Sequence, residues 1–130
     1  MDFNYKIFKN KYGFKFLSIN KPNTNLVFIN ISIKNGSDNE TMKTLEYSHF
    51  LEHILTTLTS NKYPDAFKNR KFISFNNIFI DASVDNEVTN FQFIIKKNNT
   101  LFMKFIDMLV NAFYDFKIDH RIFENEKNAI

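Results

Sequence analysis

Residues 44–58, TLEYSHFLEHILTTL, carry the clearest structural signal in this chain of 130 residues. Four apolar side chains recur there at spacings of three and four, as on one face of an α-helix: Leu51, Ile54, Leu55 and Leu58. The spacing predicts a helix of about fifteen residues. Pro64 and Asp65 then interrupt the pattern and predict a break after the helix.

Within the expected helix, HFLEH (residues 49–53) holds two of the three histidines of the chain. Positions i and i+4 of a helix project from one face, so His49 and His53 can direct their imidazole nitrogens toward one point. Glu52 lies at the edge of that face. Two neutral imidazoles with an oxygen ligand suit zinc, which keeps one position for water and lowers the pKa of that water toward ~7.

A carboxylate beside such a water can take its proton, so Glu52 would act as general base and later pass a proton to the leaving amine. The chemistry indicated is metal-assisted hydrolysis of an amide bond. HxxEH is the inverted form of the zinc motif HExxH. Three fixed positions in five also arise by chance, so the motif by itself leaves open that these are two ordinary helix histidines.

The segments before the helix predict β-structure. Residues 5–19 alternate apolar and polar side chains on both sides of a turn at residues 10–13, which predicts a hairpin. Residues 26–33 predict a strand with four apolar side chains on one face: Val27, Ile29, Ile31 and Ile33. We expect the strand to end at a turn, residues 35–37, in which Gly36 can adopt a positive φ.

The segments after the helix combine both kinds of structure. Residues 72–80 and 87–95 predict two strands, and four side chains of the second share one face: Thr89, Phe91, Phe93 and Ile95. An apolar stripe predicts a second helix from about residue 100 to 116: Phe102, Phe105, Ile106, Leu109 and Phe113. Asp119 predicts the N-cap of a third helix that continues to Ile130. The order of elements predicts an α+β fold, with an antiparallel or mixed sheet and helices packed on one face.

Composition limits the classes of function. The chain is 44% apolar and contains 17 Phe, so we expect one core built largely from aromatic rings. The net charge is +3, but basic and acidic residues are interspersed, and the pairs Arg70-Lys71 and Lys96-Lys97 favour solvated faces over a nucleic-acid patch. Cysteine is absent, so any metal site must use histidine and carboxylate.

The N-terminal segment MDFNYKIFKN shows neither a signal sequence nor a transit sequence. No run of apolar residues reaches the length of a membrane span. We therefore expect no membrane partner, no nucleic-acid partner and, by default, a cytoplasmic location.

Around the motif, an ordered series of landmarks resembles the insulinase-like, or pitrilysin-type, zinc metallopeptidases over nearly the whole chain. In order, the landmarks are the opening hairpin and strand, Gly36-Ser37-Asp38-Asn39-Glu40, SHFLEHIL, Lys62-Tyr63-Pro64, Asp81-Ala82-Ser83-Val84 with the aromatic strand after it, and Glu126-Lys127-Asn128-Ala129-Ile130. The chain resembles the first part of the catalytic domain of that family, which has the LuxS/metallopeptidase type of fold.

The resemblance implies roles for particular residues. His49 and His53 would be zinc ligands, and Glu52 would be the base that activates water. Glu126 would assist from behind the metal ligands. The segment Asp81-Ala82 would lie on the strand that aligns the substrate. The third ligand of the family would follow seven residues after Glu126, so we expect residues 1–130 to be the N-terminal portion of one metallopeptidase domain, truncated before that ligand.

Several positions depart from the pattern of the family. Glu46 stands where a glycine is usual, Asp81 replaces an asparagine and Val84 replaces a threonine. Residues 57–60, Thr-Leu-Thr-Ser, stand in place of Phe-x-Gly-Thr. These differences indicate a diverged member of the family.

The resemblance implies a zinc-dependent endopeptidase that cuts peptides or unfolded protein segments. The substrate would add as a strand to a sheet edge, and a second half-domain or partner subunit would close over it like a clamshell. The alternative is a non-catalytic relative, either an assembly subunit or a decayed gene remnant. Intact His49, Glu52 and His53 favour the peptidase, whereas the expected lack of a third ligand favours inactivity of the 130-residue fragment by itself.

Overall fold

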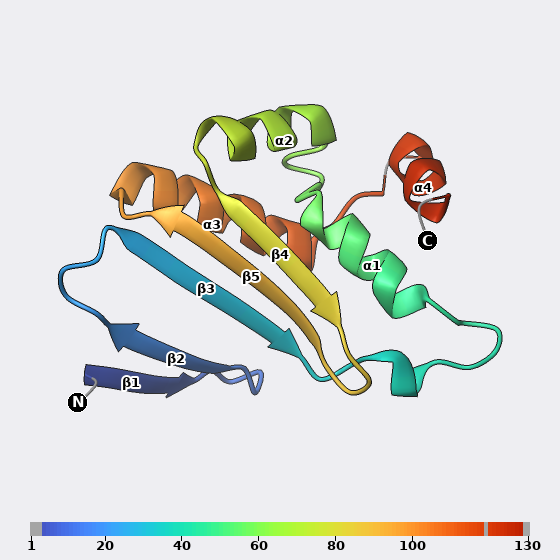
Figure 1. Cartoon of the computed structure of the whole chain (residues 1–130), viewed down its shortest axis with the longest axis horizontal. Coiled ribbons are helices and arrows are strands. Elements are labelled where there is room, and N and C mark those ends of the chain that lie inside the picture. Colours follow the sequence, from blue (N-terminus) through green and yellow to red (C-terminus); the bar gives the residue numbers. More distant parts are fainter. Residues whose placement is uncertain (1–3, 119, 129–130) are drawn as a thin grey trace.

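The computed structural model describes residues 4–118 and 120–128, and it has the expected α+β fold (Figure 1). The strands are β1 (Asn4–Lys9), β2 (Lys15–Asn20), β3 (Leu26–Ile33), β4 (Phe79–Val84) and β5 (Thr89–Lys96). The helices are α1 (Tyr47–Thr56), α2 (Ala66–Phe75), α3 (Asn99–Tyr114) and α4 (His120–Lys127), with a short 3-10 helix at Ser37–Asn39.

Strands β3, β5 and β4 form an antiparallel sheet in that order, with β5 in the centre (Figure 1). Phe93 of β5 pairs with Ile29 of β3 on one side and with Ile80 of β4 on the other. Because side chains in register share a face, these three apolar residues form one row across the sheet. Among the described residues, β4 is an edge strand, so one side of its backbone is unpaired by the sheet.

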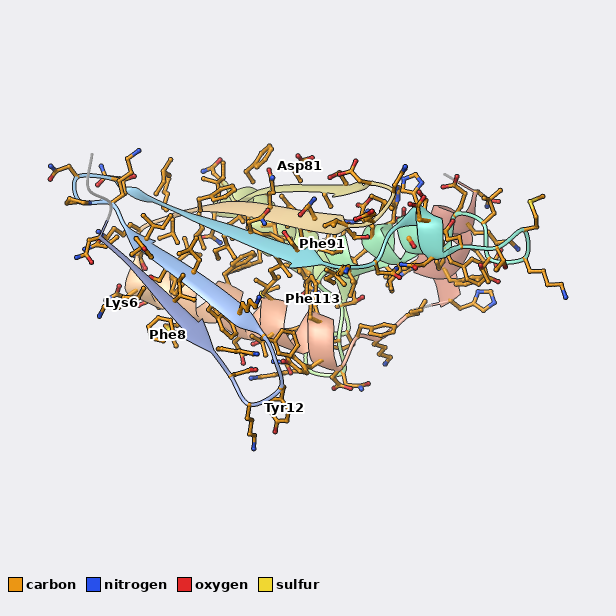
Figure 2. The ribbon with its side chains drawn as sticks, turned by 90° about the horizontal axis from the view of Figure 1, so that it is seen from below. Lys6, Phe8, Tyr12, Asp81, Phe91 and Phe113 are labelled. Atoms are coloured by element: carbon orange, nitrogen blue, oxygen red, sulfur yellow. The ribbon has the colours of Figure 1, made fainter. Side chains whose placement is uncertain are left out.

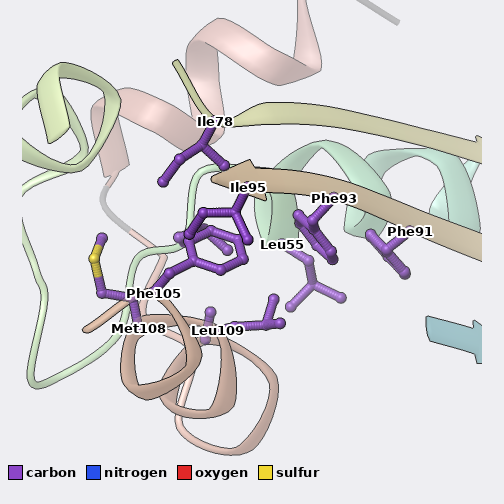
Figure 3. Close-up of a cluster of buried hydrophobic side chains, with 10 residues drawn as sticks. Leu55, Ile78, Phe91, Phe93, Ile95, Phe105, Met108 and Leu109 are labelled. Carbon is purple, nitrogen blue, oxygen red and sulfur yellow. The ribbon is translucent and has the colours of Figure 1, made fainter. Parts of the chain in front are cut away.

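The core lies between this sheet and the helices α1 and α3. The inward residues of β5, Phe91, Phe93 and Ile95, are at most 1% exposed, and they pack on Phe105 of α3 and Leu55 of α1 (Figure 3). The rings of Phe93 and Phe105 meet edge to face at 5.4 Å, a geometry that contributes about 0.5–1.5 kcal/mol beyond burial. The expectation of helices on one face of the sheet is confirmed. The expectation of a largely aromatic core is wrong, because among the described residues nine of the twelve buried apolar residues are not aromatic and nine phenylalanines are at least 37% exposed.

The β1–β2 hairpin lies apart from the three-stranded sheet, on the side of α3 (Figure 2). Its turn forms because the side-chain oxygen of Asn10 accepts hydrogen bonds from the backbone N–H groups of Tyr12 and Phe14, while Gly13 adopts a φ of 90°. The Phe14 ring lies 6.5 Å from that of Tyr114 on α3. The strand residues of the hairpin are exposed in this chain.

One predicted strand was wrong. Residues 72–80 were expected to be extended, but α2 occupies Ala66–Phe75 and β4 begins only at Phe79. The helix starts because the Asp65 carboxylate accepts a hydrogen bond from the backbone N–H of Lys68. Asn77, with a φ of 49°, then turns the chain into the strand. The apolar run at residues 72–75 suggested a strand because short apolar runs fit either structure.

The helix expected at residues 44–58 is shorter, at Tyr47–Thr56. Glu46 and Leu58 adopt left-handed φ values of 67° and 52°, which no continuing α-helix allows. Leu51, expected on the buried stripe, is 41% exposed, whereas Ile54 is 1% exposed. The N-cap expected at Asp119 lies outside the described residues.

Gly36 also differs from its prediction. Its φ is −155°, an extended value that any residue adopts. Glycine is needed there for space, because a Cβ atom on Gly36 would lie 2.1 Å from the carbonyl oxygen of Asp85, in the β4–β5 turn. The neighbouring N–H of Ser37 donates a hydrogen bond to that same oxygen. The contact holds the loop before α1 against the sheet.

Within residues 4–118 and 120–128, no helix is both long enough and apolar enough to cross a membrane.

We predict that Gly36→Ala lowers the free energy of unfolding by about 1–3 kcal/mol, because the added methyl group must displace the β4–β5 turn. Chemical denaturation measures this change. Ser37→Ala is the matched control, since it leaves the backbone contact with Asp85 in place, and its cost is expected to be small. Equal stabilities of the two variants would contradict the contact.

Candidate metal centre

Helix α1 is held at its start by a carboxylate from the preceding loop. The two oxygens of Glu40 accept hydrogen bonds from the backbone N–H groups of Glu46 and Ser48, each at 2.7 Å. These N–H groups lie at the start of the helix, where backbone N–H groups have no hydrogen-bond partners within the helix. Glu40 therefore caps α1 from six and eight residues upstream. The bond from Ser48 is the main reason that the pKa of Glu40 lies below its ordinary value of 4.5.

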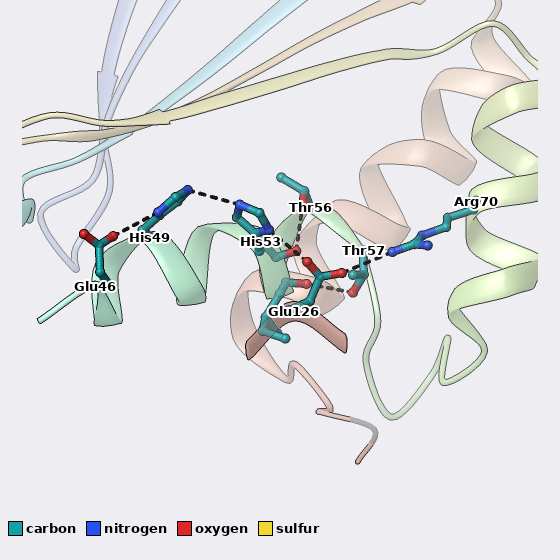
Figure 4. A network of polar contacts seen from close by, with 8 residues as sticks. Glu46, His49, His53, Thr56, Thr57, Arg70 and Glu126 are labelled. Carbon is teal, nitrogen blue, oxygen red and sulfur yellow. Dashed lines mark hydrogen bonds and ion pairs between the residues drawn. The ribbon is translucent and has the colours of Figure 1, made fainter. Parts of the chain in front are cut away.

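The two histidines of α1 face each other across one turn of the helix, as their spacing predicts (Figure 4). The Nε2 atoms of His49 and His53 are 3.1 Å apart, and the rings meet edge to face at 4.7 Å between centroids. One donor atom of Glu52 joins them, so that the donor atoms of all three residues lie within 4.8 Å of one another. The structure therefore brings together the three residues that the motif singled out.

Helix α4 brings a carboxylate to the second histidine. The rings of Phe50 on α1 and Phe123 on α4 pack edge to face at 5.1 Å, which docks the two helices. Glu126 of α4 then places Oε2 2.8 Å from Nδ1 of His53 (Figure 4). Glu126 lies where the resemblance implied, behind the imidazole, and its side chain is only 16% exposed.

The other oxygen of Glu126 is 3.4 Å from Nη2 of Arg70 on α2 (Figure 4). Arg70 therefore links α2 to the carboxylate that contacts His53. Arg70 was predicted to lie on a solvated face, and its side chain is 64% exposed. Its pairing with a residue 56 positions away could not be read from local sequence.

A cavity of about 420 Å³ opens beside Glu52, between α1, α2 and β4. Asp81 and Ala82 of β4 line it together with Thr56 of α1 and Arg70 of α2. The structure thus places the expected substrate strand next to the expected base. Burial raises the pKa of the Glu52 carboxyl, and the Asp81 carboxylate raises it further, while His53 and His49 act in the opposite direction.

The segment after α1 is fastened to α3 by a polar cluster. Lys62 Nζ lies 2.7 Å from Oδ2 of Asp107, and the Tyr63 hydroxyl donates a hydrogen bond to the same carboxylate. Lys104 Nζ lies 4.3 Å from the centre of the Tyr63 ring. The landmark Lys62-Tyr63-Pro64 is therefore an anchor for the loop that leaves the motif helix.

The residues present fit a zinc ion. Two nitrogen ligands at tetrahedral positions around zinc lie ~3.3 Å apart, given Zn–N distances of about 2.0–2.1 Å. The observed separation of the two Nε2 atoms, 3.1 Å, is close to this value. The opposite nitrogens of both rings contact carboxylates, Glu46 and Glu126. A carboxylate behind a histidine is the usual arrangement at zinc ligands.

Residues 15–130 match the family described as "Insulinase (Peptidase family M16)". The chain belongs to the insulinase family. A relative from Schizosaccharomyces pombe, named "Putative zinc protease mug138", is 28% identical over 92 residues. That match covers 71% of this chain and 9% of the relative.

Solved structures show the same fold as this insulinase-family chain. The crystal structure of pitrilysin matches 99% of the chain with a TM-score of 0.85 and 22% identity. A protease from Helicobacter pylori matches 97% of it with a TM-score of 0.81 and 20% identity. The chain spans only 13% and 30%, respectively, of the lengths of those two proteins.

We predict that Glu40→Gln lowers the melting temperature at neutral pH, because the cap loses its charge-assisted hydrogen bonds. The pKa of Glu40 is lowered by folding, so its contribution is fully present above about pH 4.5 and is lost as the pH falls through the lowered value. The melting temperatures of wild type and variant should therefore converge in acid. Asp38→Asn, which neutralises an exposed carboxylate two residues earlier, is the control. A difference in melting temperature between wild type and Glu40→Gln that stays constant down to acid pH would contradict a cap by the ionised Glu40 carboxylate.

Proposed function

We propose that this chain is the zinc-binding part of an endopeptidase that hydrolyses peptides or unfolded protein segments. The observation that carries the proposal is the 3.1 Å separation of the Nε2 atoms of His49 and His53, with a carboxylate on the far side of each ring. If both Nδ1–H groups donate to those carboxylates, both Nε2 atoms carry lone pairs. Two lone pairs this close repel each other, and a cation between them removes the repulsion.

Each residue of the cluster has a distinct part in the proposed reaction. His49 and His53 would hold the zinc ion through Nε2, while Glu126 holds the His53 ring in place. Bound zinc supplies Lewis-acid polarisation and makes a water molecule easier to deprotonate. The Glu52 carboxylate accepts the proton of the attacking water as the C–O bond forms. It then returns a proton to the amine nitrogen as the C–N bond breaks.

The position of β4 supports a substrate that binds as an extended strand. Among the described residues, β4 is an edge strand, and Asp81 and Ala82 line the cavity that also contains Glu52. A peptide hydrogen-bonded along that edge would be held through its backbone, with little dependence on its side chains. We propose that a second half-domain or partner subunit closes over the bound peptide. A cytoplasmic location remains part of the proposal.

The alternative is a non-catalytic relative, and metal binding is the first property that separates the two. We predict that His49→Ala and His53→Ala each weaken zinc binding by at least 100-fold in a competition titration against a chromophoric chelator. His120→Ala, which removes an exposed histidine of α4, is the control and should bind zinc as the wild type does. Equal affinities of all the variants would argue for a site elsewhere.

The role of Glu52 is tested separately. We predict that Glu52→Gln, made in a complete chain that includes the third ligand, keeps zinc affinity within a few-fold of the wild type but lowers kcat for an unfolded reporter peptide by about 10²–10⁴-fold, because the base is lost. Zinc content and cleavage are measured on the same preparation. Retained cleavage in a zinc-loaded variant would exclude Glu52 as the base.

A further inference from the structure

We propose that Glu46 is a positioning residue for His49, and that it plays the part for this histidine that Glu126 plays for His53. Its Oε2 lies 3.0 Å from Nδ1 of His49 (Figure 4). The inference rests on the proposed function in that His49 is taken to be a zinc ligand. The contact itself involves only the two side chains.

The backbone of Glu46 adopts a conformation that is unfavourable for a glutamate. Its φ of 67° lies in the left-handed region, which disfavours side chains with a Cβ and favours glycine. Such strain persists only where the surrounding structure enforces it, and it is often associated with function. A glycine at this position would be free of the strain.

The side chain of Glu46 does not cap α1. It makes no capping hydrogen bond, and the free N–H groups at the helix start are satisfied by Glu40. The carboxylate of Glu46 instead turns forward by one helical turn to His49. Within residues 4–118 and 120–128, the polar contact of this side chain is therefore the one to the imidazole.

The contact has a definite consequence for the histidine. A carboxylate that accepts the Nδ1–H of His49 fixes the tautomer and the ring orientation, so that the lone pair of Nε2 points toward His53. The side chains of His49 and Glu46 are 43% and 56% exposed, so solvent weakens the interaction. We accordingly expect removal of the Glu46 carboxylate to weaken zinc binding by about tenfold, which is at the low end of the range for carboxylates that contact histidine ligands.

Two substitutions separate positioning from folding. Glu46→Ala and Glu46→Gly both remove the carboxylate, but only glycine relieves the left-handed strain. We expect Glu46→Gly to melt at a higher temperature than Glu46→Ala, while both bind zinc about tenfold more weakly than the wild type. A residue that acted only through stability would give the glycine variant the tighter binding of the two. Glu46→Gln keeps an acceptor oxygen and should recover part of the affinity.

A measurement on the metal-free protein tests the contact without depending on zinc. ¹⁵N NMR of the imidazole nitrogens should show the Nδ1–H tautomer of His49 in the wild type and a mixture of tautomers in Glu46→Ala. An unchanged tautomer in that variant would overturn the inference, whether or not the chain binds zinc. If the tautomer changes in Glu46→Ala but the wild type binds no zinc, the contact stands and the proposed function is overturned. Wild-type zinc affinity in both Glu46 variants would also overturn the positioning role.

Discussion

The packing of helix α1 against the sheet is the constraint on which the candidate site depends. Ile54 is 1% exposed, and Leu55 joins the core beside Phe93. Because these side chains fix the rotation of the helix about its axis, the face that carries His49, Glu52 and His53 must turn toward α4 and β4. Burial of one face of α1 thus determines the direction in which the side chains of the candidate site point.

The site also includes three carboxylates that differ in their sequence separation from the groups they contact. Glu40 holds the start of α1, Glu46 contacts the first imidazole from within one helical turn, and Glu126 contacts the second from 73 residues away. Each of these contacts orients a group without occupying the space between the two Nε2 atoms. That space is the feature that a metal ion would use.

The parts of the site that depend on local spacing could be predicted from the sequence. The i and i+4 placement of His49 and His53 follows from helix geometry alone. The cap by Glu40 could not be foreseen, because it depends on the path of a loop and not on a fixed offset. Glu126 was anticipated only through the resemblance to a family, since no local pattern connects it with His53.

The same distinction applies to the fold. The pattern of alternating side chains in β5 predicted which of them share a face, because period-two alternation is a local property. Helix α2 was missed, since its apolar residues fit a strand equally well and its start depends on the Asp65 cap. The reason for Gly36 was also missed, because the atom that excludes a side chain there belongs to Asp85, far along the sequence.

The most direct test of the zinc site is the position of the metal in a zinc-soaked crystal, located by anomalous diffraction at the zinc edge. We expect a peak about 2.0–2.1 Å from Nε2 of both His49 and His53, with Glu126 still on Nδ1 of His53. A peak bound by only one of these histidines, or located at His120 with none between the pair, would contradict it.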